Sequence, residues 1–438
     1  MGLDQQLHHG HTRRLAGALA LAAALVLASI QVASAATLSR AWQAKIGAGT
    51  ATISAYTTGT GALALKLSGL KASTGYATVL YRGTCSAVGA KLLTLASFTT
   101  TSAGAASKTI ALTSSQVSAI TGATSGMGTI AIRVGSGSLT KCGPFVVQPV
   151  VAARVSVGHS AFGLAADGTA VWVTNFDDGT VSRIDPATNT VTATITVGRS
   201  PDSVASDGTA VWVTNSEDST VSRIDPATNA VTATVPVGTL PRGVTVGGGA
   251  VWVANWGANS VSRIDSATNA IAATVPVGLG PGGIAFGESA VWVTNWGDGT
   301  VSRIDPATNT VAATIPVGSV DSVVAGGGSV WVSVWGFPVA ANGSVARIDP
   351  ATNTVTSQVT VGYDPTGMAI VGDTLYVALS GDPTIVQVRA GAVTARTSIG
   401  MKSYGLAVGN GSLWVLHPVA SGIANSGLFA GGVTRLNI

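Results

Sequence analysis

Short apolar runs separated by turn residues recur from residue 151 onward. The segment Val291–Gly318 reads VWVTNWGDGTVSRIDPATNTVAATIPVG, and near copies occupy Val171–Gly198, Val211–Gly238 and Val251–Gly278. Within each copy the apolar runs are rich in β-branched residues and end at Gly, Pro, Asn or Asp, which is typical of strands joined by hairpins. No window keeps the 3.6-residue period of an amphipathic helix. The repeat therefore predicts an all-β structure.

Each repeat divides into four predicted strands, here named a, b, c and d. In the fourth unit they are Gly283 to Phe286, Val291 to Asn295, Val301 to Asp305 and Thr310 to Val317. The turn between c and d reads DPATN, which places Pro where a type I turn requires a φ of about −65°. The turn between b and c contains Gly297-Asp298-Gly299, which supplies the positive φ of a tight hairpin.

Large aromatic residues in strand b set the repeat length. One occurs in each of seven units: Trp172, Trp212, Trp252, Trp292, Trp331, Tyr376 and Trp414. Their spacings of 38 to 45 residues match a four-stranded propeller blade. A ring at the same place in every blade is expected to pack between blades. Strand c carries an Arg in six units, and we expect this guanidinium to stack on a ring or to pair with a carboxylate between blades.

The two ends of the repeat array complement each other. The last unit has predicted strands a, b and c at Gly405–Val408, Leu413–Leu416 and Val433–Asn437, with no strand d after them. A segment with the form of a strand d, Val151–Gly158, instead precedes the first strand a. Pairing this segment with the last unit would close a ring and remove both exposed sheet edges. We therefore predict a closed seven-bladed β-propeller over residues 151–438.

The motifs VWVTN, TVSRID, PATNTV and ATIPVG together resemble the YVTN-type repeats of the YncE-like family of seven-bladed β-propellers. They are more distantly similar to streptogramin lyase-like propellers. The resemblance covers residues 151–438 and implies the fold, because the shared residues are the scaffold itself. For function it implies two options: DNA binding, as in some YncE-like proteins, or lyase chemistry by a histidine and glutamates with a divalent metal at the channel mouth.

Residues 36–150 are predicted to form a separate small domain. Strand-like runs such as ALALKLSGL and ATVLYRGTC lie between Gly, Ser and Thr residues, which favours a small antiparallel β-sandwich. Tyr76 and the late CGPF give this segment a resemblance to Ig-like or superoxide dismutase-like sandwiches. The segment contains no His, which excludes a copper or zinc site of the dismutase kind.

Residues 1–35 have the pattern of a secretion signal. Arg13 and Arg14 precede an apolar run from Leu15 to Ile30, and Ala33-Ser34-Ala35 has the small-x-small form that signal peptidase cleaves. We expect export with cleavage after Ala35. The alternative is an uncleaved membrane anchor. The apolar run is only slightly shorter than the roughly 20 residues that a spanning helix needs.

The chain has two cysteines, Cys85 and Cys142. In an exported protein a lone pair of cysteines most simply forms one disulfide, and the model of loop entropy assigns such a bond about 4 kcal/mol. The alternative is a pair of free buried thiols.

Net charge divides the chain at the same place as the repeat pattern. Residues 36–150 carry nine Lys or Arg and no Asp or Glu, whereas residues 151–438 carry twelve basic and eighteen acidic residues. An acidic propeller argues against nucleic-acid binding, which draws on clustered Lys and Arg. The basic segment suits an anionic surface of the cell envelope, or the acidic propeller itself.

Candidate binding residues are those that differ between repeats, because the scaffold does not require them. The d–a and b–c connections of a blade share one rim, here called the mouth rim, around the channel lined by strands a. The candidates on it are Phe162, Asp202, Arg242, Trp256, Trp296, Asp321, Trp335, Tyr404 and His417. The b–c turns are longer around Phe337 and between His417 and Gly432. We expect a small molecule, peptide or protein to bind at this rim. We also expect the protein to be a monomer and to use no cofactor. The alternative is that these are ordinary surface aromatics.

A metal-dependent lyase or hydrolase at the same rim is the second hypothesis. After signal cleavage only His159 and His417 remain, and the only glutamates are Glu217 and Glu288. No His-x-Glu or Glu-x-His pair occurs in the blades. His417, expected in the longest loop of the rim, is the best candidate base. The acidic pairs in the b–c turns of the first two units are expected to be solvated rather than to bind Ca²⁺.

Overall fold

A computed structural model describes residues 38–46, 49–56, 61–67, 75–83, 88–99, 101–103, 105–124, 130–136, 139–144, 146–148, 150–336, 342–417 and 431–438. In these ranges the chain is nearly all β, with one α-helix and one 3₁₀ turn. Within the same ranges, none of the helical segments has the length and apolar character needed to cross a membrane. The predicted signal segment, residues 1–35, lies outside them.

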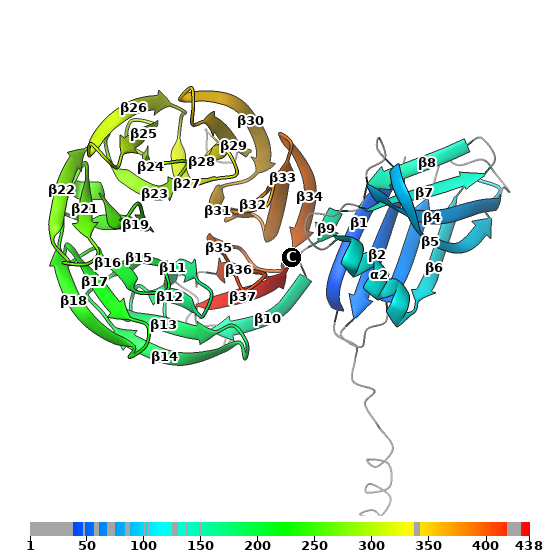
Figure 1. The fold of residues 1–438 in the computed structure, drawn as a ribbon, viewed down its shortest axis with the longest axis horizontal. Helices are drawn as coiled ribbons and strands as arrows, with labels where there is room; N and C mark the ends of the chain where they lie inside the picture. Colours follow the sequence, from blue (N-terminus) through cyan, green and yellow to red (C-terminus); the bar gives the residue numbers. More distant parts are fainter. Residues whose placement is uncertain are drawn as a thin grey trace, which may run out of the picture.

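Seven four-stranded antiparallel sheets form a ring, which confirms the predicted propeller (Figure 1). Blade 1 contains β11 (Ala161–Ala166), β12 (Val171–Asn175), β13 (Thr180–Asp185) and β14 (Thr190–Thr196). Blade 2 contains β15 (Pro201–Ser206), β16 (Val211–Asn215), β17 (Thr220–Asp225) and β18 (Ala230–Pro236). Blade 3 contains β19 (Pro241–Gly247), β20 (Ala250–Asn255), β21 (Ser260–Asp265) and β22 (Ile271–Pro276), with the turn η1 (Trp256–Ala258) after β20.

The next blades follow the same order. Blade 4 contains β23 (Pro281–Gly287), β24 (Ala290–Asn295), β25 (Thr300–Asp305) and β26 (Thr310–Pro316). Blade 5 contains β27 (Val320–Gly326), β28 (Ser329–Val334), β29 (Gly343–Asp349) and β30 (Thr354–Gly362). Blade 6 contains β31 (Pro365–Val371), β32 (Thr374–Leu379), β33 (Thr384–Arg389) and β34 (Ala392–Ser398).

Blade 7 joins the two ends of the array. It contains β35 (Gly405–Gly409), β36 (Ser412–His417) and β37 (Gly432–Asn437), and its outer strand is β10 (Val150–Ser156). Strand β10 pairs antiparallel with β37, with Val151 opposite Leu436 and Ser156 opposite Gly432. The predicted closure of the ring by the segment in front of the first unit is therefore confirmed.

Aromatic residues of strand b fill the space between neighbouring blades. The Trp side chains of five blades are fully buried: Trp172, Trp212, Trp252, Trp292 and Trp414. Strand b lies in the interior of its blade, so every residue of VWVTN in β12, β16 and β24 is buried. Blade 5 differs, because its Trp331 is only partly buried.

The Arg of strand c contributes to the junction between blades. In blade 1, Cζ of Arg183 lies 5.4 Å from the ring centroid of Trp172, its cross-strand neighbour. Nη1 of Arg183 also donates to Oδ1 of Asn229 in blade 2, at 3.0 Å. Asn229 ends the c–d turn, which reads DPATN in most blades and is here called the PATN turn. The predicted stacking is thus confirmed, and the partner in the next blade is an amide oxygen rather than a carboxylate.

The strands before the propeller form two antiparallel sheets with a shared core. One has the order β6 (Ala106–Leu112), β3 (Gly61–Leu67), β2 (Gly49–Tyr56), β1 (Leu38–Ile46), β9 (Val146–Gln148). The other has the order β5 (Val88–Thr99), β4 (Gly75–Gly83), β7 (Ile130–Ser136), β8 (Leu139–Pro144). Leu63 of the first sheet and Leu80 of the second are both fully buried in one cluster. This is the predicted sandwich.

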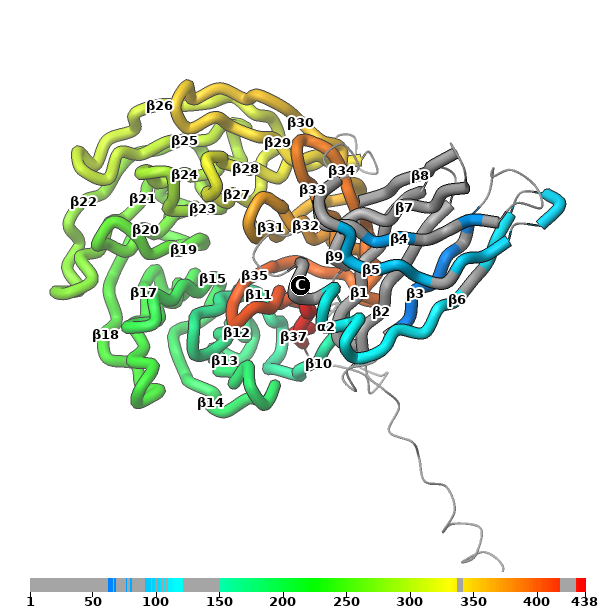
Figure 2. Tube along the Cα trace, turned by 45° about the vertical axis from the view of Figure 1, so that its right-hand side comes forward, coloured from blue at the N-terminus to red at the C-terminus, as the bar shows by residue number. Residues whose placement is uncertain are grey.

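The sandwich also contains a helix that the sequence analysis did not predict, α2 (Ser114–Thr124). The sandwich lies beside blades 6 and 7, with β9 next to β34 and β1 next to β10 (Figures 1 and 2). Cys142 belongs to β8, while Cys85 lies outside the described residues, so the disulfide remains a prediction.

Candidate functional site

Strand a of blades 1 to 6 contains a break in its pairing with strand b, at the end next to the channel mouth. In blade 2, Pro201 pairs with Asn215 and Val204 pairs with Val213, so Asp202 lies within a β-bulge. The same shift in register occurs in blades 1 to 6. Bulges redirect side chains and are common beside functional sites. The bulge residues are Phe162, Asp202, Arg242, Gly282, Asp321 and Thr366.

These positions lie inside strand a, although the sequence pattern predicted them in the d–a connections. Strand β23, for example, begins at Pro281 and not at Gly283. Tyr404 in blade 7 does precede its strand, and its N–H donates to the carbonyl of Leu416 at 3.0 Å. The variable residues therefore occupy equivalent places around one opening.

The backbone around this opening is tightly fixed. A Cβ atom added at Gly163 would lie 2.5 Å from the carbonyl oxygen of Asp202 in the next blade. Thr214 of β16 donates its hydroxyl to the carbonyl of Arg242 in the next blade, at 2.7 Å. Thr294 does the same for the carbonyl of Asp321, at 2.7 Å. Because these contacts use only the main-chain carbonyls of the bulge residues, the bulge side chains are free to differ.

Arg242, Trp256 and Trp296 form a stacked group across blades 3 and 4, here called the aromatic arch. Cζ of Arg242 lies 4.0 Å from the ring centroid of Trp256. The rings of Trp256 and Trp296 are 5.6 Å apart with 38° between their planes. Trp256 lies over Gly282, where an added Cβ would be 3.6 Å from the ring. Trp296 is 49% exposed, so the arch presents a large apolar face to solvent beside a cation.

Two carboxylates flank the arch, Asp202 in blade 2 and Asp321 in blade 5. Both are partly buried in the channel, and burial raises the pKa of each carboxyl to about 6, against the attraction of the Arg242 charge. Oγ of Ser216 lies 3.4 Å from Oδ2 of Asp202. Among the described residues, Arg242 forms no ion pair within 4.0 Å. Its exposed guanidinium is therefore held by the Trp256 ring rather than by an ion pair.

Other predicted residues of the mouth rim are more dispersed. Phe162 is 47% exposed and packs on Phe176, with ring centroids 5.6 Å apart. Tyr404 is 45% exposed. Trp335 is partly buried directly after β28, and residues 337–341 of the longer loop that follows lie outside the described ranges.

His417 is not the exposed loop residue that the sequence suggested. It is the last residue of β36, opposite Gly432, and is 3% exposed. Nδ1 is 2.7 Å from the carbonyl oxygen of Lys402, and Nε2 is 2.8 Å from Oγ1 of Thr434. Burial lowers the pKa of His417, and the nearby Arg154 charge acts in the same direction. A neutral ring donates from Nδ1 and accepts at Nε2 here, so both nitrogens are already used.

The acidic b–c turns have a structural role. Asp178 accepts hydrogen bonds from the backbone N–H of His159 and from its Nδ1, both at 2.8 Å. Asp218 accepts from the backbone N–H of Arg199 at 2.7 Å and from its Nε at 2.6 Å. These bonds lower the pKa of both carboxyls. In the described part of the chain, no three His, Cys, Asp or Glu side chains gather closely enough to hold a metal ion.

Comparisons with known proteins identify a repeat and a fold. A sequence family described as "Repeat of unknown function (DUF6923)" matches residues 112–272. The structure is similar to Kuenenia stuttgartiensis hydrazine synthase, with 18% identity and a TM-score of 0.56, over 66% of this chain and 99% of that one. It is also similar to the β-propeller domain of Cps50 (Swd1) from Myceliophteria thermophila, with 12% identity and a TM-score of 0.53, over 66% and 100% of the two chains. No curated protein matches the sequence.

The repeat array is a β-propeller. At these identities the likeness concerns the fold alone. Membership of the YncE-like family stays a prediction.

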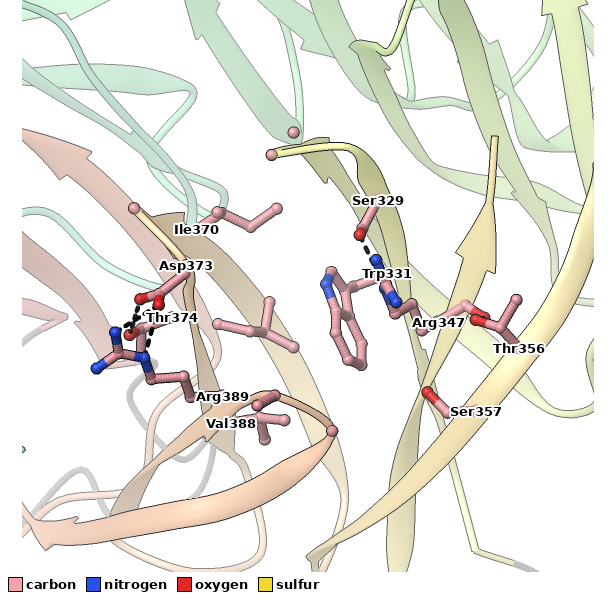
Figure 3. Close-up of a pocket in the computed structure, with 16 residues that line it drawn as sticks. Ser329, Trp331, Arg347, Thr356, Ser357, Ile370, Asp373, Thr374, Val388 and Arg389 are labelled. Carbon is pink, nitrogen blue, oxygen red and sulfur yellow. Dashed lines mark hydrogen bonds and ion pairs between the residues drawn. The ribbon is translucent and has the colours of Figure 1, made fainter. Parts of the chain in front are cut away.

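A second hollow was missed by the sequence analysis. It lies between blades 5 and 6 on the rim opposite the mouth rim, has a volume of about 440 Å³, and includes the partly buried Trp331 (Figure 3). A signal for it was present in the sequence, because the c–d turn of blade 6 lacks the PATN motif.

Proposed function

We propose that the protein is an exported, non-catalytic binding protein that uses the channel mouth of its propeller. The observation that carries this proposal is the position of Arg242, stacked at 4.0 Å on Trp256 and without a carboxylate within 4.0 Å among the described residues. An exposed guanidinium that forms no close ion pair, next to a large apolar face, is typical of a binding site.

The chemistry of the aromatic arch favours a ligand with a flat apolar part and one anionic group. The exposed ring of Trp296 offers the apolar surface, and the planar guanidinium of Arg242 suits a carboxylate, sulfonate or phosphate. Asp202 and Asp321 give the mouth a charge that depends on pH, since their pKa values are about 6. A small molecule or a peptide end satisfies these requirements.

The rest of the chain fits the same proposal. Residues 36–150 carry nine basic and no acidic side chains, a composition that would hold the propeller at an anionic surface of the cell envelope after export. Membership of the YncE-like family of YVTN-repeat propellers is part of the proposal, supported by the repeated VWVTN and TVSRID strands. The acidic propeller gives DNA binding no support.

Lyase chemistry at the mouth receives no support from the histidine that was its best candidate. His417 uses both ring nitrogens within the protein, at 2.7 and 2.8 Å. Acting as a base toward a ligand would require the ring to break one of these hydrogen bonds and to leave a buried position.

Isothermal titration calorimetry with a matched pair of probes tests the proposal. Naphthalene-2-sulfonate should bind, and 2-naphthylmethylammonium, which has the same ring system and the opposite charge, should bind at least about tenfold more weakly at pH 5.5. Arg242→Gln and Trp296→Ala should each reduce sulfonate affinity by about tenfold or more, since truncation of a hot spot costs about 2 kcal/mol. Val231→Ala, on an outer strand of blade 2, is the control. Equal binding of the two probes, or unchanged affinity in both variants, would rule the proposal out.

A further inference from the structure

A groove separates blades 5 and 6 on the rim formed by the a–b and c–d turns. Figure 3 shows Trp331 and Arg347 on the side of blade 5, and Asp373, Val388 and Arg389 on the side of blade 6. The volume of about 440 Å³ falls within the range of ligand pockets, which is about 300 to 1,000 Å³.

At three other junctions the same place is covered by the c–d turn of the next blade. Nη1 of Arg263 in blade 3 donates to Oδ1 of Asn309 at the end of the PATN turn of blade 4, at 3.1 Å. Nη1 of Arg435 in blade 7 donates to the carbonyl of Pro186 in the PATN turn of blade 1, at 2.6 Å. The turn therefore offers oxygen acceptors, from the main chain and from Asn, to the guanidinium of the preceding blade.

Blade 6 has no such turn. Its strands β33 and β34 are joined by Ala390 and Gly391 alone, with φ values of 49° and 76°. Two consecutive residues with positive φ form the tightest type of hairpin connection, which is too short to extend over the neighbouring blade. No residue of the PATN type is therefore present to cover Arg347.

The uncovered residues of blade 5 differ from their equivalents. Trp331 is partly buried, whereas the Trp of blades 1 to 4 and 7 is fully buried. Arg347 is exposed, while Arg183 and Arg263 are partly buried. Nε of Arg347 donates to Oγ of Ser329 at 2.8 Å, which holds the guanidinium at the edge of the groove (Figure 3).

The wall on the side of blade 6 is partly apolar. Val388 is 1% exposed, and Ile370 from β31 also lines the groove. Nε of Arg389 donates to Oδ2 of Asp373 at 2.6 Å, so these two charges satisfy each other. Arg347 is thus the cation of this groove that has no carboxylate partner among the described residues.

We propose that this groove is a peptide-binding site for a proline-containing turn of a partner protein, of the type Asp-Pro-Xaa-Thr-Asn. The turn would place its proline against the exposed part of Trp331, and a main-chain or Asn oxygen would accept from the guanidinium of Arg347. The repeat array supplies the template, because its own chain fills the equivalent place at the junctions of blades 1 and 2, 3 and 4, and 7 and 1.

Calorimetry on the full chain tests this site with a defined probe. The peptide acetyl-RIDPATNTV-amide should bind. A control peptide with Gly in place of Pro and Leu in place of Asn should bind at least about tenfold more weakly, because it lacks the contacts expected to contribute most to binding. Arg347→Gln should lower the affinity for the first peptide by about tenfold. Arg199→Gln, an exposed arginine on the opposite rim, should leave the affinity unchanged.

A graft provides the second variant and keeps the test informative if a point variant is destabilised. Replacing Ala390-Gly391 by Pro-Ala-Thr-Asn should cover Arg347, abolish peptide binding and raise the melting temperature. Failure of the wild-type chain to bind the peptide, or equal affinity in the wild type and Arg347→Gln, would overturn the proposal. Self-association in sedimentation velocity that the graft removes would assign the groove to a second copy and would also overturn it.

Discussion

The guanidinium of Arg242 rests on the ring of Trp256, with Cζ 4.0 Å from the ring centroid, between two carboxyls whose pKa values are raised. Desolvation and the positive charge act on these carboxyls in opposite directions, and desolvation is the larger effect at both Asp202 and Asp321. The mouth thus combines one permanent charge with two that appear only near neutral pH.

The free energy of unfolding should depend on pH because the pKa of Asp321 is raised. The pKa of Asp321 is about 6 in the folded protein, against 3.8 for an unperturbed Asp, so folding disfavours ionisation, and stability is lost as the pH rises from about 4 to about 6. Asp321→Asn removes this loss. Two pKa units correspond to about 3 kcal/mol, which water in the open channel reduces to about 1 kcal/mol.

The measurement is thermal unfolding at two pH values. At pH 8 the Asp321→Asn variant should melt about 2 to 4 °C above the wild type, and at pH 4 the two should melt together. Glu217→Gln, at a side chain that is 57% exposed, should have no effect at either pH. A variant that is less stable than the wild type at pH 8 would show that the carboxylate is favourable in the fold.

Binding at the mouth should depend on pH with the same midpoint. Naphthalene-2-sulfonate keeps its charge between pH 5 and 8, so any change in affinity reports the protein. Ionisation of Asp202 and Asp321 adds repulsion, and we expect the affinity to fall about fivefold between pH 5 and pH 7.5, which is about 1 kcal/mol of screened Coulomb energy. In the double variant Asp202→Asn, Asp321→Asn the titration should be flat; a slope that persists there would place the titrating group elsewhere.

The two Trp residues of blade 4 should behave differently when truncated. Trp292 is fully buried, and Trp292→Ala should cost about 3 to 5 kcal/mol of unfolding free energy because it leaves a cavity between blades. Trp296 is 49% exposed, and Trp296→Ala should cost about 0.5 kcal/mol or less. Urea unfolding monitored by circular dichroism measures both values, and a similar cost for the two variants would contradict the division into scaffold and mouth residues.

Strand β10 should be essential to the propeller, while the sandwich should not. A chain that starts at Val150 keeps β10 and should melt with the propeller of the full chain. A chain that starts at Ala161 lacks β10, exposes the edge of β37 and loses Val155 from the core, and should be less stable by about 3 kcal/mol or more. Equal melting temperatures for the two truncated chains would contradict the role of β10 in closing the ring.

The fold was predictable because each blade packs against its neighbours in the same way and therefore repeats nearly the same residues. Trp172 and its equivalents gave the blade length, and the strand-like segment before the first unit gave the closure. The helix α2 was missed although its start is visible in the sequence: Thr113 and Gln116 form a capping box, with the backbone N–H of Thr113 donating to Oε1 of Gln116 at 2.8 Å.

The candidate site was less accessible from sequence. The variable residues were found by comparing repeats, but the bulge that contains Arg242 depends on how Pro241 and Val244 pair with β20, which periodicity does not encode. The burial of His417 depends on Lys402 and Thr434, which belong to a loop and to another strand. The groove between blades 5 and 6 could not be predicted, because the sequence does not show that the PATN turn contacts the neighbouring blade.

The pairing of Val151 with Leu436 also sets an order of events during biosynthesis. Each of blades 1 to 6 takes its four strands from one continuous stretch, so it can form as soon as that stretch leaves the ribosome. Blade 7 cannot, because β10 is made before the other blades and its partner β37 after them. The chain must carry β10 as an unpaired strand throughout this interval, and a contact of such large sequence separation forms slowly. Closure of the ring therefore cannot begin before β37 has left the ribosome.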